Sequence, residues 1–440
     1  MGRHEWRNGR WARQKLMFID VKKAHLNGVV GEDECAYVSV PTGVCPPGKC
    51  WRLKRWLYGM RPAASAWESD YSEKLGEFGM KKGRAVPTAF FDESRNMRCV
   101  VHGDDFTFLG WEEDLEDVEK YLEKFYELKV RGVLGGEPGD MESIVILNRR
   151  LTWKGNVMRY EADERHAEMI CKGVGLESSS KGLDRPSVKE TIEEVMNEER
   201  ECPLSPEETR EFRALAARAN YLAMDRPDIQ FSVKEVCRDM AAPSKGSWLK
   251  LKRVARYLLE FPRLEWRFGG EDEENVDLET LHVFSDSDWG GCLRTRKSTS
   301  GGVVVLGGVA LKHWSSTQST IALSSGEAEY TALVKAAAEG LGVQALAADL
   351  GWTLRLVVHV DSATAKSIAS RSGVGKVRHL ETKALWVQEA VKGGRFGLAK
   401  VRGTSNPADP LTKPQGYSDF VEIFSEVGAM PIRRKVARSS

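Results

Sequence analysis

The chain has 440 residues, of which 41% are hydrophobic, so it can bury the cores of several domains. Its 65 lysines and arginines nearly balance its 64 acidic residues, and the net charge of +1 excludes a global field that attracts nucleic acid. The eight cysteines lack zinc-like pairing, which favours reduced intracellular thiols. No run of about 18 apolar residues is present, so we expect no membrane insertion.

The N-terminal third alternates strands and helices. The predicted elements are a strand at 16–21, a helix at 63–75, two short strands within 97–109 and a helix at 112–125. Asp20 lies near the end of the first strand, and the H-G-D-D turn places Asp104 and Asp105 at a hairpin tip. The turn-forming residues of 132–139 mark a domain boundary.

The middle of the chain is predicted to be mainly helical. Helices are expected at 207–223, 228–240 and 248–259, and the last is basic because it carries Lys250, Lys252, Arg253 and Arg256. The acidic segment 271–275 then separates this region from a final domain that begins near Val276.

The final domain mixes strands and helices, which predicts a mixed sheet covered by helices. The expected order is a strand to Asp286, a hairpin at Gly307-Gly308, a helix from Ser324, a strand to Asp361, helices from Ser362 and at 380–392, a strand at 396–401 and a last helix near Pro407. Residues 416–440 are predicted to be a loosely attached tail.

Four carboxylates lie where predicted elements begin or end, namely Asp286, Glu329, Asp361 and Asp409. Acids at element ends can converge on one edge of a sheet, where they stay ionised only beside cations. A pair of Mg²⁺ ions about 3.5–4 Å apart is the usual partner and suits phosphodiester hydrolysis. For the neighbouring Asp288 and Glu327 we expect structural roles, because Glu327 has the spacing of a capping box with Ser324.

Several sequence blocks occur together in a characteristic order. They are F-I-D-V-K-K-A-H-L-N-G (18–28), W-L-Y-G-M-R-P-A-A-S-A-W (56–67), V-H-G-D-D-F-T-F-L-G (101–110), S-D-S-D-W-G-G, A-L-S-S-G-E-A-E-Y, H-V-D-S-A-T-A and N-P-A-D-P-L-T-K. In these blocks and their order, the chain resembles the reverse transcriptase–ribonuclease H region of a copia-type LTR retrotransposon Pol polyprotein. The resemblance implies an N-terminally truncated piece of a longer polyprotein, because little sequence precedes Asp20.

The resemblance implies an α+β and α/β multidomain fold. Residues 1–135 would form a partial polymerase palm and fingers, 136–275 a thumb or connection-like region, and 276–415 a ribonuclease H-like mixed sheet flanked by helices, followed by the tail 416–440. The implied partners are RNA, RNA–DNA hybrids and dNTPs, with another polyprotein segment or chain completing the polymerase and no membrane. The implied location is a cytoplasmic particle or the nucleus.

The resemblance also implies roles for individual residues. The Mg²⁺ or Mn²⁺ ligands would be Asp20, Asp104 and Asp105 in the polymerase and Asp286, Glu329, Asp361 and Asp409 in the nuclease. The substrate contacts would be His25, Arg61, Arg296, Lys297, Ser298 and His379. For Arg296 to Ser298 a solvated turn is the alternative, and for His379 a surface position.

Three positions depart from the family pattern and put polymerase activity in doubt. His25 replaces an aromatic residue that excludes the ribose 2′-OH, Pro62 replaces a glutamine near the incoming nucleotide, and His102-Gly103 replaces an aromatic–aliphatic pair. Three hypotheses therefore stand: an intact nuclease with an impaired polymerase, a working enzyme with atypical or borrowed fingers, and a non-catalytic nucleic-acid-binding remnant. The basic helix at 248–259 supports the third.

Five tryptophans offer either core packing or base stacking, namely Trp248, Trp266, Trp289, Trp314 and Trp352. Each borders an apolar run, so we expect core packing for all five.

Overall fold

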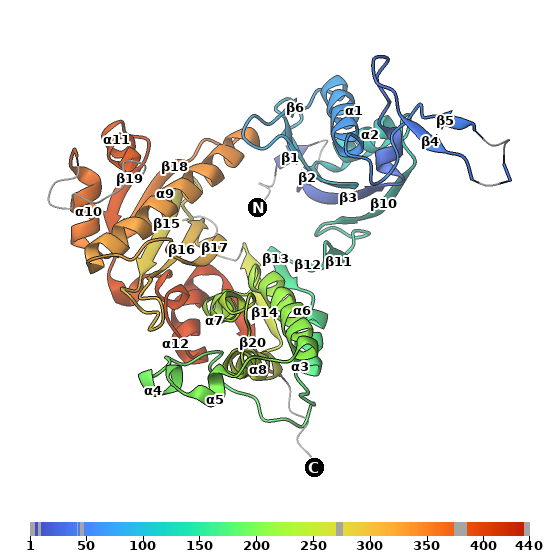
Figure 1. The fold of residues 1–440 in the computed structure, drawn as a ribbon. Helices are drawn as coiled ribbons and strands as arrows, with labels where there is room; N and C mark the ends of the chain where they lie inside the picture. The colour runs from blue at the N-terminus through green and yellow to red at the C-terminus, as the bar shows by residue number, and fades with distance from the viewer. Residues whose placement is uncertain are drawn as a thin grey trace, which may run out of the picture. The chain divides into compact units, whose positions relative to one another are not determined.

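The computed structural model describes residues 5–7, 10–41, 43–44, 48–269, 276–373 and 385–434 (Figure 1). The chain forms two compact units. The first comprises Met1–Ile144 with Ala345–Thr353, and the second comprises Val145–Gln344 with Leu354–Ser440. No helix within the described ranges is both long enough and apolar enough to span a membrane.

The first unit is built on a six-stranded sheet in the order β10-β3-β9-β8-β7-β6. Its strands are β3 (Lys15–Val21), β6 (Lys81–Lys82), β7 (Ala89–Asp92), β8 (Met97–His102), β9 (Asp105–Gly110) and β10 (Leu128–Leu134). Two small two-stranded sheets, β1 (Glu5–Arg7) with β2 (Arg10–Ala12) and β4 (Tyr37–Ser39) with β5 (Cys50–Arg52), and the 3₁₀ turn η1 (Ala24–Asn27) complete the strand-rich part.

Helices α1 (Ala63–Phe78) and α2 (Glu112–Leu122) pack on this sheet. The apolar residues Trp67, Tyr71 and Leu75 recur every fourth position of α1, so they form one buried face against Phe106 of β9. Gly79 ends α1 in the left-handed conformation, with a φ of 114°. The predicted strand, hairpin and two helices of this region are confirmed.

The second unit contains a five-stranded sheet in the order β11-β12-β13-β14-β20. Its strands are β11 (Ser143–Ile146), β12 (Arg149–Lys154), β13 (Val157–Ala162), β14 (Arg263–Phe268) and β20 (Ala429–Ile432). The accompanying helices are α3 (Arg165–Gly173), α4 (Ile192–Val195), α5 (Glu198–Glu201), α6 (Pro206–Ala223), α7 (Pro227–Arg238) and α8 (Lys245–Glu260). The three predicted helices are confirmed, and α8 begins earlier than expected because the Ser244 hydroxyl caps it by accepting the Ser247 N–H.

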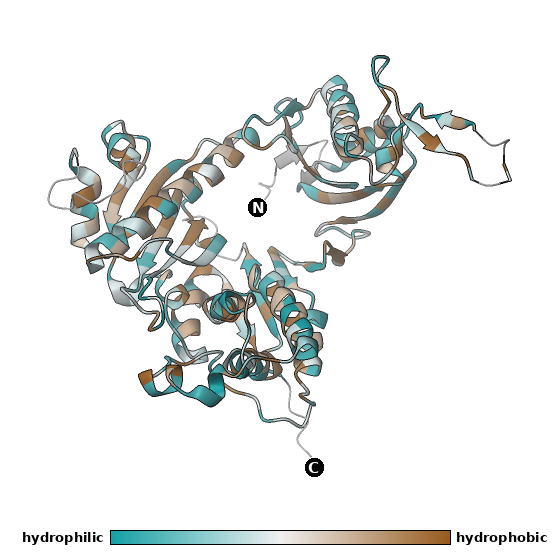
Figure 2. Cartoon of the chain, viewed as in Figure 1, coloured by the Kyte–Doolittle hydropathy of each residue, from teal (hydrophilic) through white to brown (hydrophobic). Residues whose placement is uncertain are grey.

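A second five-stranded sheet in this unit has the order β17-β16-β15-β18-β19. Its strands are β15 (Thr280–Ser287), β16 (Thr299–Leu306), β17 (Val309–Thr317), β18 (Arg355–Val360) and β19 (Gly397–Lys400), and its helices are α9 (Ser325–Asp349), α10 (Ala363–Ser370) and α11 (Trp386–Lys392). Strands β15 to β17 are antiparallel, whereas β15, β18 and β19 are parallel, so the predicted mixed sheet is confirmed. Figure 2 shows hydrophobic residues along its strands, as the almost complete burial of β16 requires.

Local sequence explains the edges of this sheet. Gly307 and Gly308 have φ angles of 59° and 74°, which only glycine adopts freely, and they form the predicted two-residue turn. The predicted helix at 380–392 is observed from Trp386, and residues 380–384 lie outside the described part of the chain.

Two predictions for the C-terminal end are wrong. Instead of a last helix near Pro407, the chain forms the short 3₁₀ turns η4 (Gly403–Ser405) and η5 (Asp409–Leu411), because closely spaced prolines remove helical N–H donors. Instead of a loose tail, the chain forms helix α12 (Tyr417–Phe424), the turn η6 (Ser425–Val427) and strand β20, which pairs with β14. Phe420 and Phe424 are 2% and 0% exposed, so this segment belongs to a core.

Candidate active sites

Three acidic side chains meet at one edge of the β17-β16-β15-β18-β19 sheet. Asp286 lies near the end of β15, Asp361 follows β18 directly and Glu329 lies in the first turns of α9. Their carboxylate oxygens lie within 4.8 Å of one another. The two aspartates come together because β15 and β18 are parallel neighbours, with Ser285 opposite Val360.

The environment of this cluster resists negative charge. Burial, followed by the charges of Asp409 and Asp361, raises the pKa of Asp286 to about 6, although the Thr412 hydroxyl donates to its Oδ2. Burial and the charges of Asp286 and Asp361 raise the pKa of Glu329 to about 9. Burial also raises the pKa of Asp361. The protein surroundings alone therefore do not stabilise full ionisation of the cluster, and its carboxyl groups keep their protons to a higher pH than usual.

The donor set fits a divalent cation. Oε2 of Glu329 is buried and has no hydrogen-bond partner among the described residues, which is a costly arrangement for a carboxylate oxygen. Three converging carboxylates supply the hard oxygen ligands that Mg²⁺ and Mn²⁺ prefer. A cation bound here would satisfy the orphaned oxygen and relieve the mutual repulsion.

The fourth predicted carboxylate, Asp409, lies beside the cluster and is held by other side chains. Its Oδ1 is 2.5 Å from Lys413 Nζ, and its Oδ2 accepts a hydrogen bond of 3.2 Å from Gln415 Nε2. Its charge nevertheless raises the pKa of both Asp286 and Asp361. Asp409 is therefore near the other three, but not within the 4.8 Å group that they form.

The two neighbouring acids have structural partners, as expected. The Asp288 carboxylate accepts the backbone N–H of Thr299. The Glu327 N–H donates to Ser324 Oγ at 3.3 Å, and its carboxylate accepts the Leu323 N–H at 2.8 Å, which caps α9.

The three aspartates of the first unit gather around a hairpin. Asp20 of β3 is the cross-strand partner of Asp105 of β9, and the Val21 N–H donates to the carbonyl oxygen of Asp104 at 2.9 Å. Burial raises the pKa of Asp105, and the charges of Asp104 and Asp20 add to this effect, whereas Arg131 opposes it. The Arg131 guanidinium lies 3.1 Å from Asp105 Oδ1. The three predicted aspartates are therefore close in space, and the positive charge of Arg131 offsets part of their negative charge.

The departure at Gly103 has a structural reason. Gly103 is the first residue of the two-residue turn between β8 and β9 and has a φ of 67°, a conformation that strains other residues. Its carbonyl oxygen accepts the indole N–H of Trp67 at 2.9 Å, which ties the turn to α1. A glycine thus stabilises the turn at the position where the family pattern has a side chain.

The predicted substrate contacts have mixed surroundings. The His25 ring stacks on Tyr58 with a centroid separation of 4.6 Å, and Arg61 is exposed. Arg296 is also exposed, and Lys297 is half-buried. Ser298 is 0% exposed and its hydroxyl accepts the Gly290 N–H at 3.0 Å, so it shapes the loop, and its contact with substrate stays a prediction. His379 lies outside the described residues.

Sequence reasoning missed three residues that contact the carboxylates: Arg131, Thr412 and Lys413. Lys413 had a readable signal, since it follows Asp409 by four positions, the spacing of a local ion pair. No sequence signal identifies Arg131, because its position beside Asp105 depends on the pairing of β10 with β3, whose register shifts between Val130 and Gly132.

The first unit contains a segment that matches a reverse transcriptase family. Residues 11–136 match the family "Reverse transcriptase (RNA-dependent DNA polymerase)". The fold of 88% of the chain is similar to 44% of a foamy viral protease–reverse transcriptase, solved in complex with an RNA/DNA hybrid, with a TM-score of 0.51 and 12% identity.

Sequence relatives extend the match along the chain. The retrovirus-related Pol polyprotein from transposon TNT 1-94 of Nicotiana tabacum is 25% identical over 94% of this chain, and that from transposon RE1 of Arabidopsis thaliana is 25% identical over 93%. The chain spans 30% and 27% of the length of these two relatives. Over 93–94% of its length the chain is therefore similar to about a quarter to a third of these Pol polyproteins, and its residues 11–136 match the reverse transcriptase family.

Proposed function

We propose that the ribonuclease H-like domain hydrolyses the RNA strand of RNA–DNA hybrids with the help of divalent cations. The observation that carries this proposal is the convergence of Asp286, Glu329 and Asp361 within 4.8 Å, with Glu329 Oε2 buried and unpartnered among the described residues. Phosphodiester hydrolysis at two metals uses this kind of carboxylate site.

The residues of the chain have distinct tasks in this proposal. Asp286, Glu329 and Asp361 would hold Mg²⁺ or Mn²⁺, with Asp409 as a further ligand. When bound, such cations make water nucleophilic at neutral pH and stabilise the leaving oxygen. The Thr412 hydroxyl orients Asp286 by donating to its Oδ2, and Lys413 restrains Asp409. Arg296 and Lys297 would bind phosphates, and the RNA 2′-OH would provide selectivity.

We further propose that Asp20, Asp104 and Asp105 serve RNA-directed DNA synthesis from dNTPs. The support is their common place at the β3–β9 edge within the segment that matches the reverse transcriptase family. His25, stacked on Tyr58, would limit space beside the nucleotide sugar, and Arg61 would contact phosphate. The Arg131–Asp105 ion pair makes this site the weaker of the two.

A labelled RNA–DNA hybrid and a primed RNA test both halves with one purified protein. We expect Mg²⁺-dependent hybrid cleavage that stops with chelator and in Asp361→Asn, while Asp105→Asn leaves cleavage in place and stops primer extension. Hybrid cleavage that persists in Asp361→Asn would refute the nuclease assignment. Salt-sensitive binding of the hybrid without turnover would support the non-catalytic alternative instead.

A further inference from the structure

A cavity of about 960 Å³ lies in the second unit, next to the nuclease carboxylates. Its walls come from the segment 183–200, from α7 and α8, from the loop that follows Asp286 and from residues 412–414. Two wall residues also contact the nuclease acids, because the Thr412 hydroxyl donates to Asp286 and Lys413 pairs with Asp409. We call this space the α8 cavity. Thr412 and Lys413 thus lie between this cavity and the candidate nuclease site.

Basic residues outnumber acidic residues in the lining of the α8 cavity. Its lining contains the eight cationic residues Arg185, Lys189, Arg200, Lys250, Lys252, Arg253, Arg256 and Lys413 and the four acidic residues Glu190, Glu194, Glu235 and Asp288. The basic face of α8 that stands out in the sequence therefore points into this cavity.

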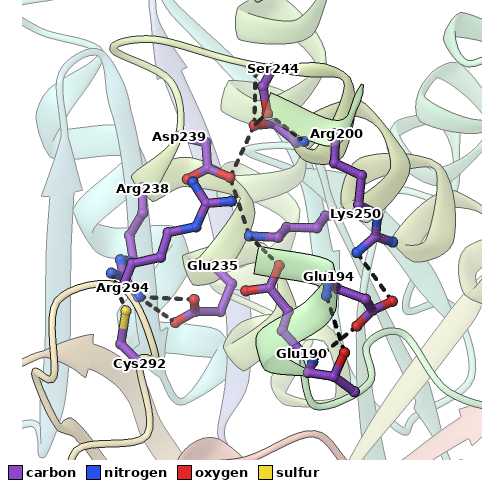
Figure 3. A network of polar contacts seen from close by, with 12 residues as sticks. Glu190, Glu194, Arg200, Glu235, Arg238, Asp239, Ser244, Lys250, Cys292 and Arg294 are labelled. Carbon is purple, nitrogen blue, oxygen red and sulfur yellow. Dashed lines mark hydrogen bonds and ion pairs between the residues drawn. The ribbon is translucent and has the colours of Figure 1, made fainter. Parts of the chain in front are cut away.

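Cationic side chains of the protein already pair with three of the four acidic residues of the wall. Lys250 lies 3.2 Å from Glu190 and Arg200 lies 3.1 Å from Glu194, and both pairs can be followed in Figure 3. Glu235 pairs with Arg238 at 2.9 Å. These acidic residues are therefore already paired, and the lining contains further cationic residues without an acidic partner among them.

Four cations of the cavity have no such balance, because Lys189, Lys252, Arg253 and Arg256 form no ion pair with any acidic residue that the structure describes. Arg256 Nε donates to the carbonyl oxygen of Lys181 at 2.9 Å, whereas Arg253 Nε is buried without a hydrogen-bond partner within the described ranges. Lys189 and Lys252 are exposed. Together these cations provide two or more points for binding anions along one wall.

An aromatic surface faces the same space. Trp289 lines the cavity and is 58% exposed, so our expectation that it packs in a core is wrong. Its indole N–H donates to the carbonyl oxygen of Ala322 at 3.1 Å, which holds the ring in place. Cations that line a groove together with an exposed aromatic ring are typical of sites for single-stranded nucleic acid, where phosphates meet the cations and a base stacks on the ring.

We propose that the α8 cavity binds a single-stranded segment of nucleic acid that adjoins the strand at the nuclease carboxylates. This inference rests on the proposed function of the nuclease site. Lys189, Lys252 and Arg253 bind successive phosphates, and Trp289 stacks on a base. The cavity thereby retains an unpaired overhang and favours hybrids that carry one over blunt hybrids.

Fluorescence anisotropy of a labelled oligo(dT) of about 12 nucleotides tests the proposal on the full chain in chelator. We expect the double variant Lys252→Glu with Arg253→Glu to bind at least tenfold more weakly. A plot of the logarithm of the binding constant against the logarithm of the salt concentration should also become less steep, by about 1.4 for two lost phosphate contacts on a single strand. The matched control is Lys154→Glu with Lys172→Glu, which reverses two exposed charges of the same unit away from the cavity and should bind like the parent.

The aromatic contact has its own test. Trp289→Ala should weaken oligo(dT) binding about tenfold, and Trp289→Phe should restore most of it, because any aromatic face can stack on a base. Equal binding by the parent and the cavity variants would overturn the proposal. Displacement of the oligonucleotide by poly-glutamate at equal charge concentration would also overturn the proposal, because the cavity would then bind any polyanion.

The outcome is separable from that of the proposed function because chelator prevents hydrolysis. A parent that binds oligo(dT) through the cavity but cleaves no hybrid in Mg²⁺ would refute the nuclease and leave the cavity site in place. If the parent cleaves the hybrid and the cavity variants bind oligo(dT) as the parent does, the nuclease proposal would stand and the cavity proposal would be refuted. Thermal melting of each variant checks that it is folded.

Discussion

The candidate nuclease site of the second unit and the candidate polymerase site of the first unit each gather acidic side chains, but in opposite surroundings. Three nuclease carboxylates meet within 4.8 Å, and Asp286 is only 7% exposed. In the palm, Asp104 is exposed at a hairpin tip and Asp105 already has Arg131 as a partner at 3.1 Å. In the first unit, Arg131 balances part of the carboxylate charge. In the second unit, the carboxylate cluster includes the unpartnered oxygen Glu329 Oε2, which a bound cation would satisfy.

The different strand arrangements explain this contrast. In the nuclease, Asp286 and Asp361 follow parallel neighbouring strands, and Glu329 from α9 completes the cluster. In the palm, Asp20 and Asp105 lie opposite each other on antiparallel strands at the sheet surface. The first arrangement buries charge and raises pKa values strongly, whereas the second leaves room for water and for an arginine.

The largest effect that sharpens this comparison is expected for Glu329→Gln. The change removes one of three converging carboxylates. Loss of a group that only hydrogen-bonds a metal ligand can lower activity by up to about 100-fold, so loss of a ligand itself should lower it at least as much. Hybrid cleavage in Mg²⁺ should fall at least about 100-fold, and Asp105→Asn serves as the control in the other unit. Cleavage within a few-fold of the parent would mean that the buried cluster is not the active one.

Lys413→Ala should have the next largest effect. Without Lys413 Nζ, which lies 2.5 Å from its Oδ1, Asp409 is no longer restrained beside the cluster. We expect hybrid cleavage to fall about tenfold, as for other outer-shell contacts, with a higher Mg²⁺ requirement. Lys413→Arg keeps the charge and should recover most of the rate. A Mg²⁺ titration of all three proteins measures the difference.

Stability should depend on pH through the raised pKa values of Asp286 and Glu329. Both groups hold protons in the folded state that the unfolded chain releases near pH 4 to 5, so in chelator the melting temperature should fall as pH rises toward 9. Mg²⁺ should raise the melting temperature more at pH 8 than at pH 6, because the ligands must be ionised. Glu329→Gln should flatten the profile in chelator. A melting temperature that rises with pH in chelator would contradict the account.

Arg131→Ala should have the smallest effect and would make the palm more like the nuclease. Its ion pair with Asp105 is partly exposed, and such pairs contribute about 0–1 kcal/mol to stability. We expect little change in the free energy of unfolding, a higher pKa for Asp105 and a few-fold lower Mg²⁺ requirement for primer extension. Lys120→Ala removes another exposed ion pair of the same unit and serves as the control.

The sequence predicted the elements that position the acids but not their environment. Asp286, Glu329 and Asp361 were recognisable because apolar strands and a capped helix surround them. The buried state of Glu329 Oε2 depends on packing that no local pattern encodes. Asp409 was expected in a helix, whereas prolines hold it in a 3₁₀ turn beside Lys413.

Contacts between residues far apart in sequence account for the other errors. The sequence predicts a loose tail where β20 forms, because the partner of β20 is β14, near residue 265, and nothing in the sequence of either strand identifies the other. Core packing is predicted for Trp289 and Trp352 because each borders an apolar run, yet they are 58% and 46% exposed. Both errors arise from tertiary placement, which local periodicity does not encode.

One measurement tests the central claim most directly. Crystals of the full chain soaked with Mn²⁺ should show anomalous scattering between the carboxylates of Asp286, Glu329 and Asp361, and crystals of Glu329→Gln should lose or weaken that signal. An ordered parent crystal without metal at this edge of the sheet, or with one of the three carboxylates turned away, would contradict the account.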